Sequence, residues 1–480
     1  MTSLQDRSRA AVWHPCTQMA RLADVPPLPI ARGDGPWLFD TDGNRYFDAN
    51  SSWWVNLFGH SDRPLHDAIK AQLDTLPHVM LAGCTHEPAV RLAERLSART
   101  QGRLGHVFFG SDGASAVEIA LKQSFHAWKN RGRADKREFV CLKNSYHGET
   151  LGALSVTDVQ VFRDAYDPLL MRAHIVASPD SRLGNEAEAL AAMRTLLAER
   201  HASIACVIVE PLVQGAAGMV MHSPGYLKGL RELTREFGVH LIADEIAVGC
   251  GRTGTFFAWE QVDSAHWPDF ITLSKGITGG TLPLSLVLTT HAVYQAFWSQ
   301  DVARGFLHSH SYSGNALACA AANAVLDRFD AGQIEANRVQ AAALARAFAP
   351  LADHPRVRHL RQRCMILAFD VSDAGERFSE RFHLAARQRE LLIRPIGATV
   401  YLMPPYLIDD EAARFLANAV THTLDEVLRH AALAPENPAR RHCRARPDPC
   451  AAGGPHTHGT PPDTERPGRP SPRAADVLLQ

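Results

Sequence analysis

A scarce residue type gives the first candidate for chemistry. Of the 50 lysines and arginines, only seven are lysines, at positions 70, 122, 129, 136, 143, 228 and 275. Lys275 follows the apolar run 270–273 and is itself followed by several glycines. A lysine amine partly removed from water can have a lowered pKa and form a Schiff base with an aldehyde. Lys143 follows the run 139–142 in the same way; Lys275 is favoured because glycines let a cofactor approach the backbone closely.

A turn of small residues is suited to binding a phosphate. Residues 110–115 read Gly-Ser-Asp-Gly-Ala-Ser, between a strand-like run ending at Phe109 and a helical pattern beginning near Ala116. The first N–H groups of a helix have no intrahelical acceptor and lie at the positive end of its dipole, which favours an anion. A tight turn in which Ser115 caps the helix explains the same residues without a ligand. The pattern alone leaves both interpretations open.

An acidic and an aromatic residue follow two other apolar runs. Asp244 comes after the run 239–242, where a carboxylate can keep a ring nitrogen protonated by charge pairing. An aspartate that only caps a helix is the alternative. Tyr146 lies in Asn-Ser-Tyr-His-Gly, residues 144–148, and offers a ring for stacking. A planar, phosphorylated pyridine aldehyde needs a phosphate turn, an aromatic ring, a carboxylate and a lysine, and the chain presents them in this order.

The elements that would position these residues form a β-α-β pattern from about residue 105 to 290. Residues 116–130 predict a helix, because their apolar side chains fall near one face. Ligands of open α/β sheets bind at the carboxyl ends of the strands, so the candidate groups are expected to meet at one edge. Short apolar runs predict five strands, at 106–109, 139–142, 206–209, 239–242 and 270–273.

The remainder of the chain predicts a smaller α+β unit and a tail. Helices are expected at 336–348 and 410–430, with strands near 365–369 and 399–402. The tail contains ten prolines and few large apolar side chains, so it cannot offset its ordering entropy. We expect four regions: an N-terminal segment, 1–65, that packs with the small domain; a large cofactor-binding domain, 66–324; a small C-terminal domain, 325–434; and a disordered tail, 435–480.

Composition narrows the class of protein. The 480 residues carry a formal net charge of -1, which offers no basic field for nucleic acid. The nine cysteines include no C-x-x-C pair, so neither a zinc site nor any other metal is expected. No apolar stretch is long enough to predict a membrane span, and the N-terminus lacks a signal core. We expect a protein of the reducing cytoplasm that acts on small molecules.

At this point the chain resembles a known family, the class III aminotransferases among the fold type I pyridoxal-phosphate enzymes. The resemblance extends from about residue 13 to 430 and implies an α/β fold: a large domain with a mainly parallel, seven-stranded sheet, plus a smaller α+β domain. The motifs that carry it are Asn-Ser-Tyr-His-Gly at 144–148, Val-Glu-Pro at 209–211, Leu-Ile-Ala-Asp-Glu at 241–245, Gly-Arg-Thr-Gly at 251–254, Ser-Lys-Gly at 274–276 and Ser-Gly-Asn-Ala-Leu-Ala at 313–318.

The resemblance implies pyridoxal 5′-phosphate as the cofactor and gives roles to the residues around its ring. Lys275 is expected to bind the cofactor covalently and to shuttle the proton between substrate and cofactor carbons. Asp244 is expected to pair with the pyridinium nitrogen. Tyr146 is expected to stack on one face of the ring and Ile246 to cover the other.

The resemblance also implies which residues bind the cofactor phosphate and the substrate. The backbone of Gly113 and Ala114 is expected to bind the phosphate. Arg394 is expected to pair with a substrate carboxylate through its bidentate fork, although one more surface arginine is the alternative. The neighbouring subunit of a homodimer is expected to contribute Ser309, His310 and Ser311. The substrate cavity is expected to be lined by Trp53 and Tyr401, with contacts also from Tyr146, Lys275 and Ser309.

A second set of motifs lies outside the generic cofactor core and resembles the branch of the family that serves biotin synthesis. The resemblance implies S-adenosylmethionine as amino donor and 8-amino-7-oxononanoate as acceptor. The motifs are Trp-His-Pro at 13–15, Ser-Ser-Trp-Trp at 51–54, His-Val-Met at 78–80, Gly-Cys-Thr-His at 83–86, Ile-Arg-Pro at 393–395 and Tyr-Leu-Met-Pro-Pro-Tyr at 401–406.

Two residues depart from the family pattern. Cys16 stands where many relatives have tyrosine, which puts in doubt how the donor is gripped. Ala114 stands where they have serine, and Ser115 is expected to replace that hydroxyl. Two other enzyme functions are alternatives on the same scaffold: another ω-amino-acid or lysine-using aminotransferase, and an isomerase that returns the amine to another carbon of the same molecule. A third alternative is a catalytically silent interaction protein that keeps only the fold, and the presence of Lys275, Asp244 and Tyr146 together argues against it.

Overall fold

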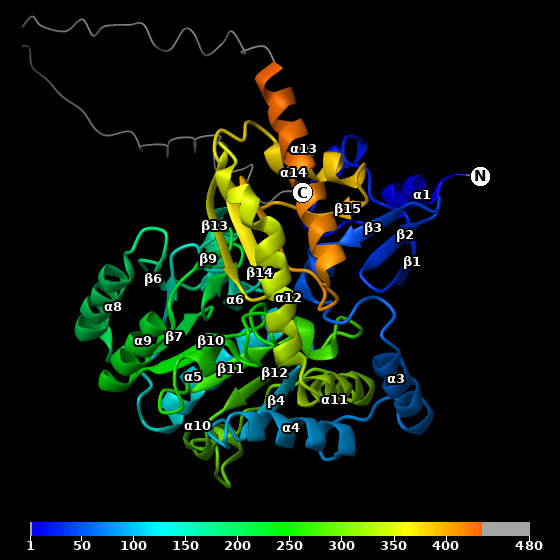
Figure 1. Cartoon of the computed structure of the whole chain (residues 1–480). Helices are drawn as coiled ribbons and strands as arrows, with labels where there is room; N and C mark the ends of the chain where they lie inside the picture. The colour runs from blue at the N-terminus through cyan, green and yellow to red at the C-terminus, as the bar shows by residue number, and fades with distance from the viewer. Residues whose placement is uncertain (1, 434–480) are drawn as a thin grey trace, which may run out of the picture.

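A seven-stranded sheet forms the centre of the protein in the computed structural model, which describes residues 2–433 (Figure 1). Its order is β4-β12-β11-β10-β7-β5-β6. Strand β12 is antiparallel to the other six, which all point the same way. All five predicted strands are confirmed. The bounds are β4 His106–Gly110, β5 Glu138–Leu142, β6 His174–Val176, β7 Ile204–Val209, β10 His240–Asp244, β11 Phe270–Leu273 and β12 Ser285–Thr289.

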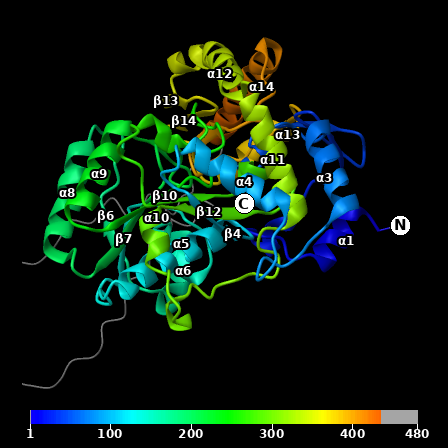
Figure 2. The same ribbon diagram turned by 90° about the horizontal axis from the view of Figure 1, so that it is seen from below.

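Helices cover both faces of this sheet, which explains why its strands read as continuous apolar runs. Side chains alternate between two buried clusters: Phe139 and Cys141 pack with α5, whereas Val140 and Leu142 point to the opposite face. Figure 2 shows α5 on one side of the strands and α4 and α11 on the other. The helices are α4 Glu87–Arg99, α5 Gly113–Asn130, α8 Glu186–Arg200, α9 Pro224–Glu236, α10 His291–Gln295 and α11 Ala316–Asp330.

Two smaller sheets flank the large one. The antiparallel sheet β13-β14-β16 stands above it in Figure 1 with α12 and α14, in agreement with the predicted helices and strands. The N-terminal sheet, β1-β2-β3, takes its fourth strand, β15, from the C-terminal third of the chain. The bounds are β1 Ile30–Asp34, β2 Trp37–Asp40, β3 Arg45–Asp48, β13 Val357–Arg363, β14 Ile366–Val371, β15 Leu391–Leu392, β16 Thr399–Leu402, α12 Gln333–Phe348, α13 Phe378–Arg387 and α14 Asp410–Leu433.

Short elements complete the chain. The remaining helices are α1 Leu4–Ala11, α2 Ser51–Trp54, α3 Arg63–Thr75, α6 Leu151–Ser155 and α7 Gln160–Arg163. A two-stranded sheet joins β8 Val213–Gln214 to β9 Val220–Met221. The 3-10 helices are η1 Met19–Ala23, η2 Asp164–Leu169, η3 Ala258–Gln261, η4 Lys275–Thr278, η5 Val302–Arg304 and η6 Ala349–Asp353.

One boundary differs from its prediction. Helix α5 begins at Gly113, and its cap is Asp112, whose carboxylate accepts the N–H of Ser115 at 2.9 Å. Ser115 is therefore not the cap, because Asp112 supplies an equally good side-chain acceptor three residues earlier. The predicted disordered tail, 435–480, lies outside the described residues. No helix in the described part of the chain is long and apolar enough to cross a bilayer.

Candidate active site

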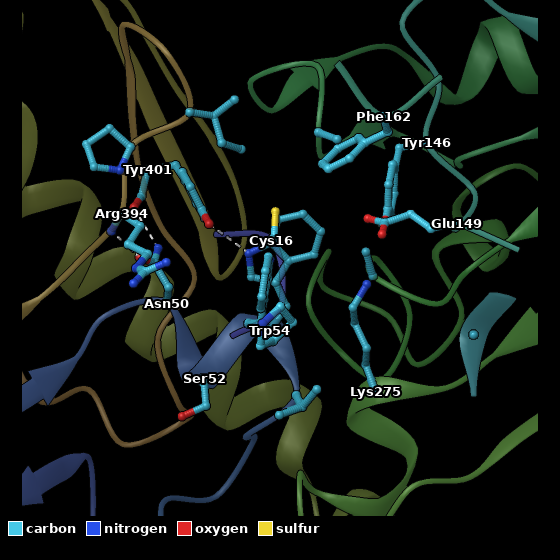
Figure 3. Close-up of a pocket in the computed structure, with 18 of the residues that line it drawn as sticks. Cys16, Asn50, Ser52, Trp54, Tyr146, Glu149, Phe162, Lys275, Arg394 and Tyr401 are labelled. Atoms are coloured by element: carbon cyan, nitrogen blue, oxygen red, sulfur yellow. Dashed lines mark hydrogen bonds between the residues drawn. The ribbon is translucent and has the colours of Figure 1, made fainter. Parts of the chain in front are cut away.

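A cavity of about 890 Å3 opens at the carboxyl edge of the large sheet. One wall consists of loops that follow the sheet strands, and the facing wall comes from the N-terminal segment and from residues near 377–401 (Figure 3). All four kinds of predicted group therefore reach one space, as the strand-end rule requires. The first wall includes Asp112, Gly113, Ala114, Tyr146, His147, Glu149, Glu210, Asp244, Ile246 and Lys275; the second includes Cys16, Asn50, Ser52, Trp53, Trp54, Arg394 and Tyr401.

Lys275 presents its amine to this cavity directly after β11. Its φ is 44°, and its Nζ lies 4.7 Å from the centroid of the Trp54 ring. Burial lowers the pKa of the amine, while the carboxylates of Asp244 and Glu210 oppose that shift. Lys143 is exposed and does not line the cavity. The structure thus separates the two lysines that the sequence pattern left as rivals.

Asp244 ends β10 and is 4% exposed. Its carboxylate contacts His147 Nδ1 at 2.6 Å and accepts hydrogen bonds from Thr272 Oγ1 at 3.1 Å and the N–H of Ile246 at 3.2 Å. These three contacts fix the carboxylate in one orientation. A fixed negative charge at this edge can hold a proton on a ring nitrogen that enters the cavity.

Glu210 is a second buried carboxyl on the same wall. It accepts the N–H of Tyr146 at 3.1 Å and the N–H of Gly215 at 3.0 Å. Burial raises the pKa of Glu210 to about 7, with His147 lowering it and Asp244 raising it further. Glu210 therefore titrates near neutral pH, unlike an exposed glutamate.

The substitution Glu210→Gln should change how stability depends on pH. Because the folded-state pKa of about 7 lies above the ordinary value of 4.5, the folded protein holds this proton more tightly than the unfolded chain. The stabilisation of the folded state by this tighter proton binding is fully present below pH 4.5 and is lost as pH rises through 7. As pH rises from 5 to 8.5, we expect the free energy of unfolding of the wild type to fall by up to about 3 kcal/mol more than that of the variant. Urea unfolding without cofactor at pH 5 and 8.5 measures this; a constant difference would contradict it.

The start of α5 fits a phosphate group. Gly113 and Ala114 line the cavity in the first turn, where no intrahelical acceptor exists for their N–H groups. A Cβ on Gly113 would lie 3.1 Å from Ile246 Cγ2, and a Cβ on Gly148 would lie 2.6 Å from that of Ala114. The glycines thus preserve space that side chains would fill. Ser115 is not among the lining residues, so the hydroxyl predicted from it does not reach the cavity.

The aromatic turn lies on the same wall. The Tyr146 hydroxyl donates to Glu149 at 3.0 Å, and its ring lies 5.5 Å from that of Phe162. Burial raises the pKa of Tyr146, so the phenol stays protonated. Tyr146 and Ile246 both line the space beside Lys275, where a flat ring needs apolar cover.

The facing wall supplies a cation. Arg394 lines the cavity, and its backbone N–H donates to Asn50 Oδ1 at 2.7 Å (Figure 3). Among the described residues, no carboxylate lies within ion-pair distance of its guanidinium. Cys16 lines the cavity too, and burial raises the pKa of its thiol. An arginine at a cavity, with no carboxylate of residues 2–433 in ion-pair distance, can pair with a carboxylate of a ligand.

Both predicted aromatics of this wall line the cavity. Trp53 is 54% exposed, whereas Tyr401 is buried and accepts a hydrogen bond from Trp54 Nε1 at 3.0 Å. The turn α2 that carries both tryptophans is left-handed, because Ser51–Trp54 have φ values of 50°, 47°, 72° and 73°. Each such residue costs about 1–2 kcal/mol, so neighbouring contacts must hold the turn.

The three residues predicted to come from a neighbouring subunit do not line the cavity of this chain. Ser309 and Ser311 are exposed. His310 contacts Ser111 Oγ through Nδ1 at 3.1 Å. Their expected contact with the phosphate therefore stays a prediction that needs a second chain.

Sequence reasoning missed several lining residues. His147 and Glu210 lie in the motifs at 144–148 and 209–211, after predicted strands, so the strand-end rule could have selected them. Glu149 and Trp54 lie beside residues that were selected. Asn50 and Ser52 follow no predicted strand. Ser52 lies in the motif at 51–54 but was given no role there, and nothing in the local pattern marks Asn50.

A lysine amine, an oriented carboxylate and a helix N-terminus in one cavity of an α/β fold define an enzyme site for pyridoxal phosphate. The class III aminotransferase family model matches residues 18–424, and the chain belongs to this family. It is 43% identical over 426 residues to adenosylmethionine-8-amino-7-oxononanoate aminotransferase of Helicobacter pylori, covering 87% of this chain and 96% of that protein.

Solved structures agree. Adenosylmethionine-8-amino-7-oxononanoate aminotransferase from Methanocaldococcus jannaschii superposes with a TM-score of 0.84 at 33% identity, covering 88% of this chain and 98% of that one. An amine transaminase from an uncultivated Pseudomonas species, solved in its PLP-bound form, superposes with a TM-score of 0.81 at 30% identity. The match covers 87% of this chain and 99% of that one. The protein is therefore a pyridoxal-phosphate-dependent aminotransferase. Within residues 2–433, no cluster of three or more metal-ligating side chains occurs.

Proposed function

We propose that this enzyme transfers the amino group of S-adenosylmethionine to 8-amino-7-oxononanoate, forming 7,8-diaminononanoate in biotin synthesis. The observation that carries the reaction type is the convergence of Lys275, Asp244 and the start of α5 in one cavity, with Arg394 opposite. The choice of substrates is supported by the name of the Helicobacter pylori relative, which matches the chain over most of both lengths.

Each residue of the strand-end wall has a role in this proposal. Pyridoxal phosphate, when bound, supplies a ring that withdraws electrons from the substrate carbon. The first N–H groups of α5 would bind its phosphate, and Asp244 would keep the ring nitrogen protonated. Tyr146 and Ile246 would cover the ring and exclude water.

Lys275 moves the proton. Its lowered pKa leaves a larger fraction of the amine neutral near physiological pH, so Nζ can accept a proton from the substrate carbon and return it elsewhere. The ring of Trp54 lies against Nζ and limits where the amine can turn. The same lysine would therefore anchor the cofactor and, once the incoming amine has released it, act as the general base.

Arg394 and the facing wall receive the substrate. We expect Arg394→Ala to raise the KM for 8-amino-7-oxononanoate about 10- to 100-fold, because a charge-assisted hydrogen bond contributes about 1.5–3 kcal/mol. Steady-state kinetics at saturating donor measure this effect. Arg394→Lys keeps the charge but loses the bidentate fork, so its KM should lie between those of the wild type and Arg394→Ala. An unchanged KM in both variants would remove Arg394 from the substrate site.

The assembly and location are part of the proposal. We propose that the enzyme is a homodimer in which a loop of the partner subunit contributes Ser309, His310 and Ser311 to the phosphate site. We also propose that it acts in the cytoplasm. The large domain spans 66–324, the small domain 325–434, and the segment 1–65 packs with the latter. Support comes from the parallel pairing of β3 with β15, which joins the chain's first fifty residues to its C-terminal third.

Single half-reactions test the substrates. The holoenzyme is mixed with S-adenosylmethionine alone, and loss of the long-wavelength cofactor absorbance is expected. Addition of 8-amino-7-oxononanoate should then restore it. If L-lysine changes the absorbance and S-adenosylmethionine does not, the donor belongs to another branch of the family. If the donor step occurs but the oxononanoate restores nothing, the acceptor is wrong.

A further inference from the structure

The left-handed turn α2 is the least favourable backbone in the cavity wall. Four consecutive residues other than glycine, Ser51–Trp54, have positive φ. Ser52 and Trp53 have ψ values of 52° and 44°, which completes the left-handed helical geometry. L-residues adopt this conformation singly rather than in runs, so the surroundings must impose it.

Asp48 is the residue that bonds this turn most directly. It is 1% exposed and ends β3. Its Oδ1 accepts the N–H of Ser52 at 2.9 Å, and its Oδ2 accepts the Ser52 hydroxyl at 2.7 Å. A bidentate grip on one residue fixes both its backbone and its side chain.

His60 holds Asp48 in place. Its Nε2 lies 3.1 Å from Asp48 Oδ2, and its Nδ1 lies 3.1 Å from Asn56 Nδ2. Asn56 Oδ1 accepts the N–H of Gly59 at 2.7 Å, so the amide nitrogen must face His60 and donate to Nδ1. The proton of a neutral His60 then lies on Nε2 and points at Asp48. The network therefore has one consistent set of donors.

Further bonds join the turn to the small domain. Ser51 Oγ donates to the carbonyl of Met403 at 2.6 Å, and Asn50 Nδ2 donates to the carbonyl of Tyr401 at 3.1 Å. Trp54, at the other end of the turn, donates its N–H to the Asn50 carbonyl at 2.8 Å and accepts from Arg252 at 3.4 Å. Ser52, in the middle, is held through its N–H and hydroxyl by Asp48, so loss of Asp48 removes the bonds that oppose relaxation of the backbone at Ser52.

The turn sets the position of Trp54. The indole lies between Tyr401 and Lys275 in Figure 3, donating to the first at 3.0 Å and lying 4.7 Å from the Nζ of the second. Because a left-handed turn directs side chains differently from a right-handed one, relaxation would move this ring. The wall opposite Asp244 and the packing around the lysine amine would change together.

We propose that Asp48 is a positioning residue for amino transfer: with His60 it holds the left-handed turn that places Trp54 against Lys275. It acts through Ser52 and the indole rather than on the reacting atoms. The inference rests on the proposed site but not on the identity of the donor. Its function is to keep a strained backbone in the one conformation that shapes the cavity.

Asp40 provides a matched control. It belongs to the same small sheet, is 7% exposed, and accepts four hydrogen bonds, from the Asp42 and Asn44 N–H groups, Asn44 Nδ2 and Tyr46 OH. Asp40 does not line the cavity. Asp40→Ala and Asp48→Ala thus remove similar side chains from one sheet. Asp48 differs in that it bonds Ser52 of the turn and also lines the cavity, so the crystal structures must show that the turn has moved.

Crystal structures and half-reactions of the holoenzymes decide the proposal. In Asp48→Ala, residues 51–54 should leave the left-handed region and Trp54 should lose its bond to Tyr401, whereas Asp40→Ala keeps both. The saturating rate of the S-adenosylmethionine half-reaction should fall at least tenfold in Asp48→Ala and less than twofold in Asp40→Ala. Retention of the turn, or a rate within twofold of wild type, would overturn the proposal.

Two more variants separate positioning from a general loss of stability. Ser52→Gly in the Asp48→Ala background should recover about fivefold in rate, because glycine adopts positive φ readily; no recovery would indicate a merely structural role and overturn the proposal. If Asp48→Ala does not fold, Asp48→Asn, which keeps one acceptor, is measured against the same criteria. If wild type does not react with S-adenosylmethionine, the donor is wrong and the crystal structures alone decide the role of Asp48.

Discussion

Lys275→Ala is expected to abolish amino transfer, lowering kcat by at least about 10^4-fold, while the protein still folds. The amine that lies 4.7 Å from the Trp54 ring is the nucleophile and proton carrier of the proposed mechanism. Within residues 2–433 it forms no ion pair whose loss would weaken the fold. The φ of 44° also means that the position does not favour any β-substituted residue, so alanine adds no new backbone cost. Cofactor bound without this amine should lack the long-wavelength absorbance of the wild type.

Lys143→Ala is the matched comparison. Lys143 also follows a sheet strand, but its side chain is exposed and lies outside the cavity lining. Its removal should leave kcat within about twofold of wild type and the absorbance unchanged. Borohydride reduction followed by peptide mapping should label the peptide containing Lys275 in wild type. Labelling of the Lys143 peptide would reverse the assignment.

The sequence allowed prediction of the part of the fold whose physics is local. Strands buried on both faces read as apolar runs, so β4, β5, β7, β10 and β11 were recognisable. The edge strand β6 has three residues, and Ile175 within it is 42% exposed, which leaves too little apolar pattern to identify. The pairing of β3 with Leu391–Leu392 joins segments far apart in the chain, and no local signal marks it.

The candidate site divides in the same way. Lys275 and Asp244 follow apolar strands, so their meeting at one sheet edge follows from topology alone. The facing wall depends on how the N-terminal segment docks, and that is decided by tertiary contacts such as Ser51 Oγ to the Met403 carbonyl. The left-handed turn, residues 51–54, contains no glycine or asparagine, so its sequence does not predict positive φ angles. The sequence therefore indicates the chemistry of the first wall and leaves the geometry of the second to the structure.

These two walls divide the work of an aminotransferase. The groups of the strand-end wall follow buried strands and bond to one another, as Asp244 does to His147 and Thr272. The facing wall combines Arg394, the strained turn and an N-terminal segment held by ion pairs such as Arg21 with Glu380. Chemistry common to the family can stay constant on the first wall while substrate choice varies on the second.

Asp244→Asn is expected to lower kcat by about 10^3-fold while cofactor binding is retained. Asparagine keeps the size and can still accept from Thr272 and Ile246, but it carries no negative charge to hold a proton on the ring nitrogen. Removing one partner of a buried charge pair costs about 3–5 kcal/mol, which corresponds to the expected loss when it falls on the transition state. Covalent attachment depends on Lys275, so the visible absorbance should remain, shifted rather than lost.

Asp269→Asn separates this effect from a loss of stability. Asp269 precedes β11 at the opposite edge of the same sheet and pairs with Arg231 at 2.7 Å. Its substitution should lower the thermal midpoint by at least as much as Asp244→Asn, yet leave kcat within about threefold of wild type. The reason is that its bonds go to Arg231, Leu241 and Thr289, which do not line the cavity. If Asp244→Asn kept kcat within tenfold of wild type with cofactor bound, the ring nitrogen would not need this carboxylate. The contact with His147 at 2.6 Å would then be a structural bond rather than part of the site.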